Sequence, residues 1–266
     1  MTPLELALVA AAGLAAGTIN TIVGSGSLVT FPLLVALGLT PVEANISSKL
    51  GIIPGGVSGT WGYRHHLPRA GRALATLATC SAVGGLAGAL LLLALPGSVF
   101  DAVVPVLIGA AGVLVVTQPF IKARLARSRA TAPAAGAAPG DGGVGLPEAL
   151  PWGLLLGLGA VGVYSGYFGA AQGVMYMAVL GLGTAATVQQ QNALKNLLAL
   201  VSNGMSALVF VVVAWSAVDW LVVALLAAGS AVGGMVGARV GQRLSPWAIR
   251  GCVAVICVLA VIDLLR

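Results

Sequence analysis

The chain has 266 residues, of which 59% are hydrophobic and 8% are charged, and its mean hydropathy is +1.04. A soluble domain is about 45–50% apolar and about 25% charged, so this composition excludes a soluble globular fold and indicates a membrane protein. The net charge of +6 is best explained by arginines in loops that face anionic lipid, which argues against a nucleic-acid partner.

The uncharged stretches predict the membrane segments in chain order. There is no charged residue between Glu5 and Glu43, and none between Glu148 and Lys195. A single span needs about 20 apolar residues, so each stretch is long enough to enter the membrane twice. The N-terminus has no basic residue before its apolar run and is therefore interpreted as a first membrane segment, not a signal peptide. The remaining apolar runs are 50–62, 73–95, 102–121, 196–214, 220–238 and 247–265.

Two related halves are indicated by an internal repeat. SAVGGLAGAL at Ser81–Leu90 returns as SAVGGMVGAR at Ser230–Arg239, an offset of 149 residues. Gly17 and Gly24 recur with the same spacing as Gly162 and Gly169, an offset of 145. Asn45 and Asn192 are 147 residues apart. This drift is what a few small insertions between two copies would produce.

Basic residues predict how the halves are oriented, because short cytoplasmic loops carry the excess of Lys and Arg. One basic cluster at 64–72 precedes the first SAVGG copy, whereas a cluster at 239–250 follows the second copy. The first copy should therefore run outward and the second inward, with Ser81 and Ser230 beginning their helices at opposite faces. The third cluster, at 122–129, is also expected to be cytoplasmic, and both termini are expected outside.

The predicted fold is an all-α polytopic membrane protein with two inverted-topology repeats. Each repeat should contain a broken or re-entrant first element followed by three transmembrane helices, giving 8–10 membrane segments. The expected domains are a first repeat over 1–121, a basic and Ala/Pro/Gly-rich cytoplasmic linker over 122–150, and a second repeat over 151–266. The predicted location is the cell (inner or plasma) membrane.

Glycine-rich segments in the middle of the two overlong stretches predict interrupted helices. Gly24-Ser25-Gly26-Ser27 and Gly169-Ala170-Ala171-Gln172-Gly173 lie at matching places in the halves. An open backbone in lipid is tolerated where it is buried in protein or lines a cavity, and transporters with inverted repeats place their sites at such breaks. Glycines can also simply permit close helix packing, which is the preferred interpretation for Gly84, Gly88, Gly233 and Gly237.

A polar cluster follows each break and contains a lysine. In the first half it runs from Glu43 to Lys49, and in the second from Gln189 to Asn196. A lysine deep in a membrane marks a functional site or an ion pair, although one near the interface can instead extend its amine to water. The candidate substrate-binding residues are Asn20, Gly24, Ser25, Gly26, Ser27, Asn45, Ser48, Lys49, Tyr164, Gly169, Gln172, Asn192, Lys195, Asn196 and Asn203.

Three segments resemble the TauE/SafE family, also called the sulfite exporter or TSUP family of membrane transporters. They are Ala16–Gly59, Gly162–Met175 (GVYSGYFGAAQGVM) and Gln191–Gly204 (QNALKNLLALVSNG). The resemblance implies transport of a small sulfur-containing anion such as sulfite, sulfoacetate or another organosulfonate. An inside-negative membrane potential drives an anion outward, so we expect a secondary transporter that works as an exporter. The alternatives are a non-transporting membrane scaffold and an importer of a different small organic anion.

Other chemistry has little support in the sequence. There is no phosphate loop of the G-x-x-x-x-G-K-[ST] type, no H-E-x-x-H and no G-x-S-x-G, so neither direct ATP use nor hydrolysis is expected. We expect no catalytic residues, no cofactor and no metal. The expected partners are a small anionic substrate and the lipid bilayer, with no nucleic acid, and the sequence leaves open a homodimer.

Overall fold

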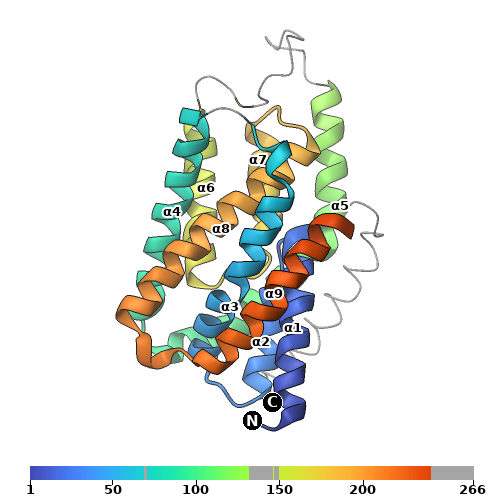
Figure 1. Cartoon of the computed structure of the whole chain (residues 1–266). Coiled ribbons are helices and arrows are strands. Elements are labelled where there is room, and N and C mark those ends of the chain that lie inside the picture. The colour runs from blue at the N-terminus through green and yellow to red at the C-terminus, as the bar shows by residue number, and fades with distance from the viewer. Residues whose placement is uncertain (69–70, 132–145, 147–149, 241–266) are drawn as a thin grey trace.

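The computed structural model describes residues 1–68, 71–131, 146 and 150–240, and this part of the chain is helical without strands (Figure 1). The last predicted span, 247–265, lies outside the described residues. The α-helices are α1 (Pro3–Ile22), α2 (Ser27–Ala36), α3 (Pro41–Gly62), α4 (Gly71–Ala94), α5 (Gly97–Thr131), α6 (Trp152–Tyr167), α7 (Gln172–Gly183), α8 (Val188–Val213) and α9 (Trp220–Val240), with short 3-10 turns η1 (Arg64–His66) and η2 (Trp215–Ala217).

Five of the described helices are long and apolar enough to cross a membrane, which confirms the predicted class of all-α polytopic membrane protein. They are Pro3–Ile22, Gly71–Ala94, Gly97–Leu114, Val188–Val213 and Trp220–Arg239. Helix α5 continues to Thr131, so the first ten residues of the predicted linker, 122–131, belong to a helix. Most of the rest of that linker lies outside the described residues.

Both overlong uncharged stretches fold into helical hairpins. The second arms, α2 and α7, have 10 and 12 residues, about 15–18 Å of helix, which is close to half the thickness of a bilayer core. Helix α7 folds back along α6, because a Cβ on Gly157 would lie 2.9 Å from Val179 and one on Gly183 would lie 2.8 Å from Leu154. A Cβ on Gly26, just before α2, would lie 2.4 Å from Ala16 O in α1. The first element of each half is thus broken, and its second arm is too short to cross a bilayer core alone.

Threonine caps start the helix after each hairpin. Thr40 accepts from the backbone of Glu43 while the Glu43 side chain accepts from Thr40, and Thr187 and Gln190 make the same reciprocal pair. Such capping boxes satisfy N–H groups that a helix start leaves unpaired. Helices α3 and α8 therefore begin at 41 and 188, earlier than the apolar runs at 50 and 196 predicted, and the polar clusters lie within their first three turns.

The SAVGG helices pack against the opposite half of the chain. Helix α9 packs along α1 and α3, whereas α4 packs along α6 and α8. Ser230 Oγ donates to Gly51 O at 2.7 Å, and Ser81 Oγ donates to Leu198 O at 2.9 Å, so both contacts link residues at the offsets expected from the repeat. Both serines lie midway along their helices. The prediction that they begin them was therefore wrong, because α4 and α9 start ten residues earlier, at Gly71 and Trp220.

Small residues make these crossings possible. A Cβ on Gly84 would lie 2.4 Å from Gly159 O, and one on Gly233 would lie 2.1 Å from Leu14 O. The prediction of packing glycines is confirmed for Gly84, Gly88, Gly233 and Gly237. The two contacts are equivalent in the repeat, because Gly84 and Gly233 are 149 residues apart and their partners Leu14 and Gly159 are 145 residues apart.

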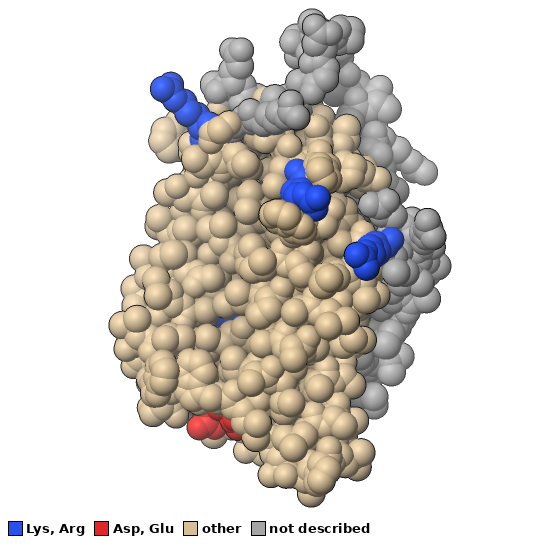
Figure 2. Space-filling model, viewed as in Figure 1, with Lys and Arg blue, Asp and Glu red and all other residues tan. Residues whose placement is uncertain are grey.

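Charges separate along the bundle. Figure 2 shows Lys and Arg side chains toward one end and Asp and Glu at the other. Helix α4 begins beside Arg72, whereas α9 begins after Asp219 and carries Arg239 in its last turn, so the two helices run in opposite directions (Figure 1). The positive-inside rule predicts that the arginine end is cytoplasmic.

Single cysteines at Ser98 and His65 test this orientation, after Cys80, Cys252 and Cys257 are replaced. Both positions are exposed, Ser98 at the start of α5 and His65 in η1 next to Arg64. An impermeant thiol reagent added to intact cells should label the cysteine at 98, and should label the one at 65 only after permeabilisation. Equal labelling of both sites in intact cells would show that the two ends do not lie on opposite sides.

Alanine at the packing glycines should destabilise the protein. A Cβ on Gly88 would lie 2.0 Å from Val163 O, so Gly88→Ala must push α4 away from α6, at a cost of about 1–3 kcal/mol. The matched control is Gly204→Ala in α8, where no described atom lies within 4 Å of the new Cβ and alanine improves helix propensity by up to about 1 kcal/mol. Thermal unfolding in detergent should separate the two, and equal midpoints would contradict tight packing at Gly88.

Candidate functional site

The two hairpins each contain a glycine with the same unusual backbone conformation at the break. Gly24 and Gly169 both have φ of 83°, in the left-handed region that favours glycine, and they are related by the offset of 145. Ala171 at the start of α7 also has positive φ, 56°. The sequence prediction of interrupted helices at these two segments is therefore confirmed.

The breaks contact each other inside the bundle. Gly173 N–H donates to Gly24 O at 3.0 Å, and a Cβ on Gly24 would lie 2.3 Å from Gly173 Cα. Ser27 Oγ also reaches toward Gly169 O, at 3.5 Å. The unwound backbone of one half is thus covered by that of the other, which is the condition for an open backbone at membrane depth.

Each half supplies a lysine to the end of the other half's first hairpin helix. Lys49 Nζ donates to Ser165 O at 2.5 Å and also to Gly166 O, in the last turn of α6. Lys195 Nζ donates to Thr21 O at 3.0 Å, in the last turn of α1. Thr21 and Gly166 are 145 residues apart, the same offset as the two breaks, so the two amines bind equivalent carbonyls. The lysines themselves are 146 residues apart, one more than this offset.

These lysines are fully buried, with 1% of each side chain exposed. The alternative that they extend to the membrane interface is therefore wrong. The last four carbonyls of a helix lack intrahelical donors and carry partial negative charge, which favours a cation there. The Lys49 amine also lies 5.7 Å from the centroid of the Phe210 ring. Both lysines thus stabilise helix ends across the interface between halves.

The second break carries a network of partnered polar side chains that sequence reasoning largely missed. Ser202 Oγ donates to Ser165 Oγ at 2.9 Å, and Ser165 Oγ donates to Gln172 Oε1. Tyr176 OH and Ser81 Oγ are 2.5 Å apart. Only Gln172 of these had been predicted. Ser202 lies two helical turns after Lys195 on the same face, and that spacing was the available signal.

The predicted site residues are buried, except that Tyr164 and Asn192 are partly exposed. Several bind protein groups: Asn45 Nδ2 donates to Tyr167 O at 2.9 Å, and Tyr164 OH donates to Ala170 O at 2.6 Å. Asn192 hydrogen bonds to Tyr63, beyond the end of α3. The structure therefore gathers most of the predicted residues around the two breaks but places Asn192 away from them. The other buried residues of the predicted substrate-binding set are Asn20, Ser25, Gly26, Ser48, Asn196 and Asn203, of which Ser48 bonds to Thr30.

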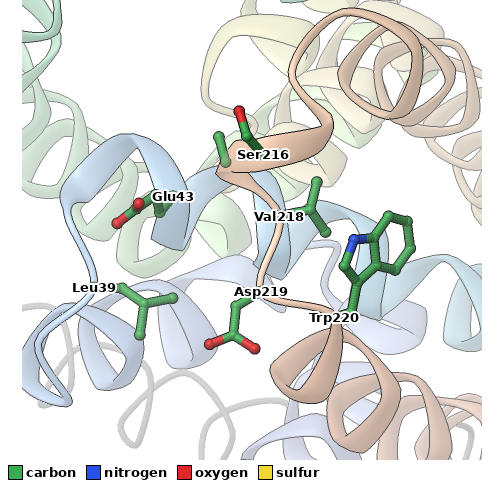
Figure 3. Close-up of a pocket in the computed structure, with 7 residues that line it drawn as sticks. Leu39, Glu43, Ser216, Val218, Asp219 and Trp220 are labelled. Atoms are coloured by element: carbon green, nitrogen blue, oxygen red, sulfur yellow. The ribbon is translucent and has the colours of Figure 1, made fainter.

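A cavity of about 390 Å³ lies at the acidic end of the bundle (Figure 3). It is lined by Leu39, Glu43, Ser216, Ala217, Val218, Asp219 and Trp220. Its carboxylates already accept backbone bonds, Glu43 from Thr40 N–H and Asp219 from Leu221 and Val222 N–H. Two acidic side chains disfavour an anion, so this cavity differs from the predicted site in position and charge. Within the described ranges, no group of three or more His, Cys, Asp or Glu could hold a metal ion.

Comparison with known proteins gives a family. The family model described as "Sulfite exporter TauE/SafE" matches residues 9–264. The "Probable membrane transporter protein YfcA" of Escherichia coli (strain K12) is 29% identical over 178 residues, which is 66% of this chain and 59% of that protein. The "Probable membrane transporter protein ORF9" of Sinorhizobium sp is 33% identical over 105 residues, 39% of this chain and 40% of that protein. No solved structure matches the chain.

Removing the Lys49 amine should destabilise the fold. Lys49→Met keeps much of the apolar stem but leaves the carbonyls of Ser165 and Gly166 without this donor. A buried acceptor left without its donor costs about 1–3 kcal/mol, so the unfolding midpoint in detergent should fall clearly. Arg72→Met is the control, because Arg72 is exposed and a surface change of this kind stays within about 0.5 kcal/mol. A Lys49→Met protein as stable as the wild type would contradict the capping role.

Proposed function

The chain belongs to the TauE/SafE family of membrane transporters, and from that premise we propose that it is a secondary transporter that exports a small sulfur-containing anion, such as sulfite, sulfoacetate or another organosulfonate. The matched region spans 59% of the length of the curated relative from E. coli. The substrate and the direction of transport are therefore proposals for this chain.

One observation carries this proposal: two interrupted helices meet at their breaks in the interior of the bundle, where Gly173 N–H bonds to Gly24 O. Secondary transporters with repeated halves bind substrate at such broken helices near the membrane midplane. Hydroxyl, amide and amine donors lie buried around the breaks, and oxyanions are held by donors of these kinds.

The charge distribution favours export. Arginines at one end of the bundle attract anions, whereas Glu43 and Asp219 line the cavity at the other end. If the arginine end is cytoplasmic, an anion is attracted on the inner side and repelled from re-entering on the outer side. Moving one negative charge outward through an inside-negative potential gains about 2.3 kcal/mol per 100 mV, so export needs no coupled ion.

A flux assay with purified protein in liposomes tests the proposal. Sulfite, sulfoacetate, taurine, sulfate and acetate are compared under an imposed potassium diffusion potential. We expect protein-dependent movement of sulfite or sulfoacetate that accelerates when the starting compartment is negative. Gly24→Leu is the matched inactive variant, because its side chain would collide with Gly173. Flux of none of the five compounds, or equal flux in Gly24→Leu, would contradict the proposal.

A further inference from the structure

The two breaks share a left-handed glycine, Gly24 or Gly169, but differ in how their polar side chains are partnered. At the second break, Ser165, Gln172, Ser202 and Tyr164 all have hydrogen-bond partners within the protein. At the first break, Ser25 Oγ has no hydrogen-bond partner among the described residues. The same is true of Thr60 Oγ1 in α3 and of Asn196 Nδ2 in α8. Buried polar atoms in folded proteins are nearly always bonded, so each of these three calls for a partner beyond the described residues.

Two of the three belong to side chains that are almost completely enclosed. Ser25 is 1% exposed and Asn196 is 6% exposed. Ser25 lies between Gly24 and Gly26, in the unwound segment that follows α1. A side chain in this position cannot reach bulk water, so its hydroxyl must bind a ligand or an internal water.

Helix register places Asn196 opposite Thr60. Helices α3 and α8 are neighbours, and Gly56 lies against Leu200 while Tyr63 bonds to Asn192. The two helices are therefore antiparallel, since residue numbers rise along α3 as those of the neighbouring α8 residues fall. In each pair the two residue numbers add up to 255 or 256. Thr60 follows Gly56 by one helical turn, and Asn196 precedes Leu200 by one turn. Thr60 and Asn196 thus lie at the same level of this pair of helices, and no hydrogen bond joins their unpartnered atoms.

The same region adjoins the end of α1. Thr21 lies against Gly59, the residue before Thr60, since a Cβ there would lie 2.4 Å from Thr21 Oγ1. Lys195, the neighbour of Asn196, donates to Thr21 O at 3.0 Å. Helix α1 ends one residue after Thr21, and Ser25 follows in the break. All three residues are therefore next in sequence to a group at the end of α1: Ser25 follows that helix, Thr60 follows Gly59, and Asn196 follows Lys195.

We propose that Ser25, Thr60 and Asn196 form the subsite that binds the sulfur oxyanion, and that the second break is a structural lock. This inference rests on the proposed function. The hydroxyls of Ser25 and Thr60 and the amide of Asn196 all donate, which matches a ligand whose oxygens only accept, such as sulfite or a sulfonate. Thr60 lies in the last turn of α3, four residues before Arg64, so the subsite is near the arginine-bearing end, where an exported anion would be loaded.

Apolar replacements of similar shape test the subsite: Ser25→Ala, Thr60→Val and Asn196→Leu. Each should raise the apparent KM for sulfite about tenfold in the liposome assay, while leaving the unfolding midpoint without sulfite unchanged or higher, because an unpartnered buried group has been removed. The shift of that midpoint by sodium sulfite should shrink in parallel. Ser165→Ala is the matched control; it should lower the midpoint but keep KM within twofold, since Ser165 is partnered.

Asn196→Asp keeps the side-chain volume but replaces the amide donor by a carboxylate, which repels an anion, so this variant should abolish sulfite flux. It tests the role of Asn196 in case Asn196→Leu does not fold. Wild-type protein that carries none of the tested anions would contradict the proposed function itself. Wild-type flux with unchanged KM in all the folded variants, Asn196→Asp included, would overturn the subsite and assign these atoms to internal water. A KM raised equally by Ser165→Ala would place the subsite at the second break.

Discussion

A lysine amine from each half binds a backbone carbonyl at the end of the other half's first hairpin helix, and the architecture depends on this exchange. Interrupting a helix inside the membrane leaves carbonyls without donors, and burying a lysine leaves an amine without acceptors. Either group alone would be strongly unfavourable in a low-dielectric interior. Lys49 with Gly166, and Lys195 with Thr21, satisfy both requirements at once. The breaks can therefore exist where they do because the lysines of the opposite half are there.

The rest of the bundle holds this exchange in place. Helix α9 of the second half packs along α1, and α4 of the first half packs along α6, with glycines that bring the backbones into direct contact. Ser81 and Ser230 fix these helices to α8 and α3 by equivalent hydrogen bonds. The first helix of each hairpin thus packs along the SAVGG helix of the other half, so a movement of α1 or α6 would be transmitted to α9 or α4.

The sequence predicted the membrane class, the two breaks and the polar clusters after them, because these depend on composition and on glycine, which local patterns record. It did not decide between a crossing and a re-entrant first element, and it did not give the lengths of α2 and α7, which are too short to cross a bilayer core alone. The pairs Thr40–Glu43 and Thr187–Gln190 match the capping-box pattern in the sequence, and that pattern predicts the first residues of α3 and α8 correctly. The partners of Lys49 and Lys195 could not be predicted from the sequence, because they are backbone carbonyls and every residue has one. The same holds for the unpartnered state of Ser25, Thr60 and Asn196, which appears only once the register of α3 and α8 is known.

Hydrogen–deuterium exchange of the two hairpins tests the exchange of lysines most directly. If each amine stabilises the opposite hairpin, removing Lys49 should accelerate exchange in peptides that cover the end of α6 and the second break, 162–173, and leave 17–27 nearly unchanged. Removing Lys195 should do the reverse, accelerating exchange over 17–27. Acceleration confined to the mutated lysine's own helix, or spread equally over both hairpins, would contradict the account.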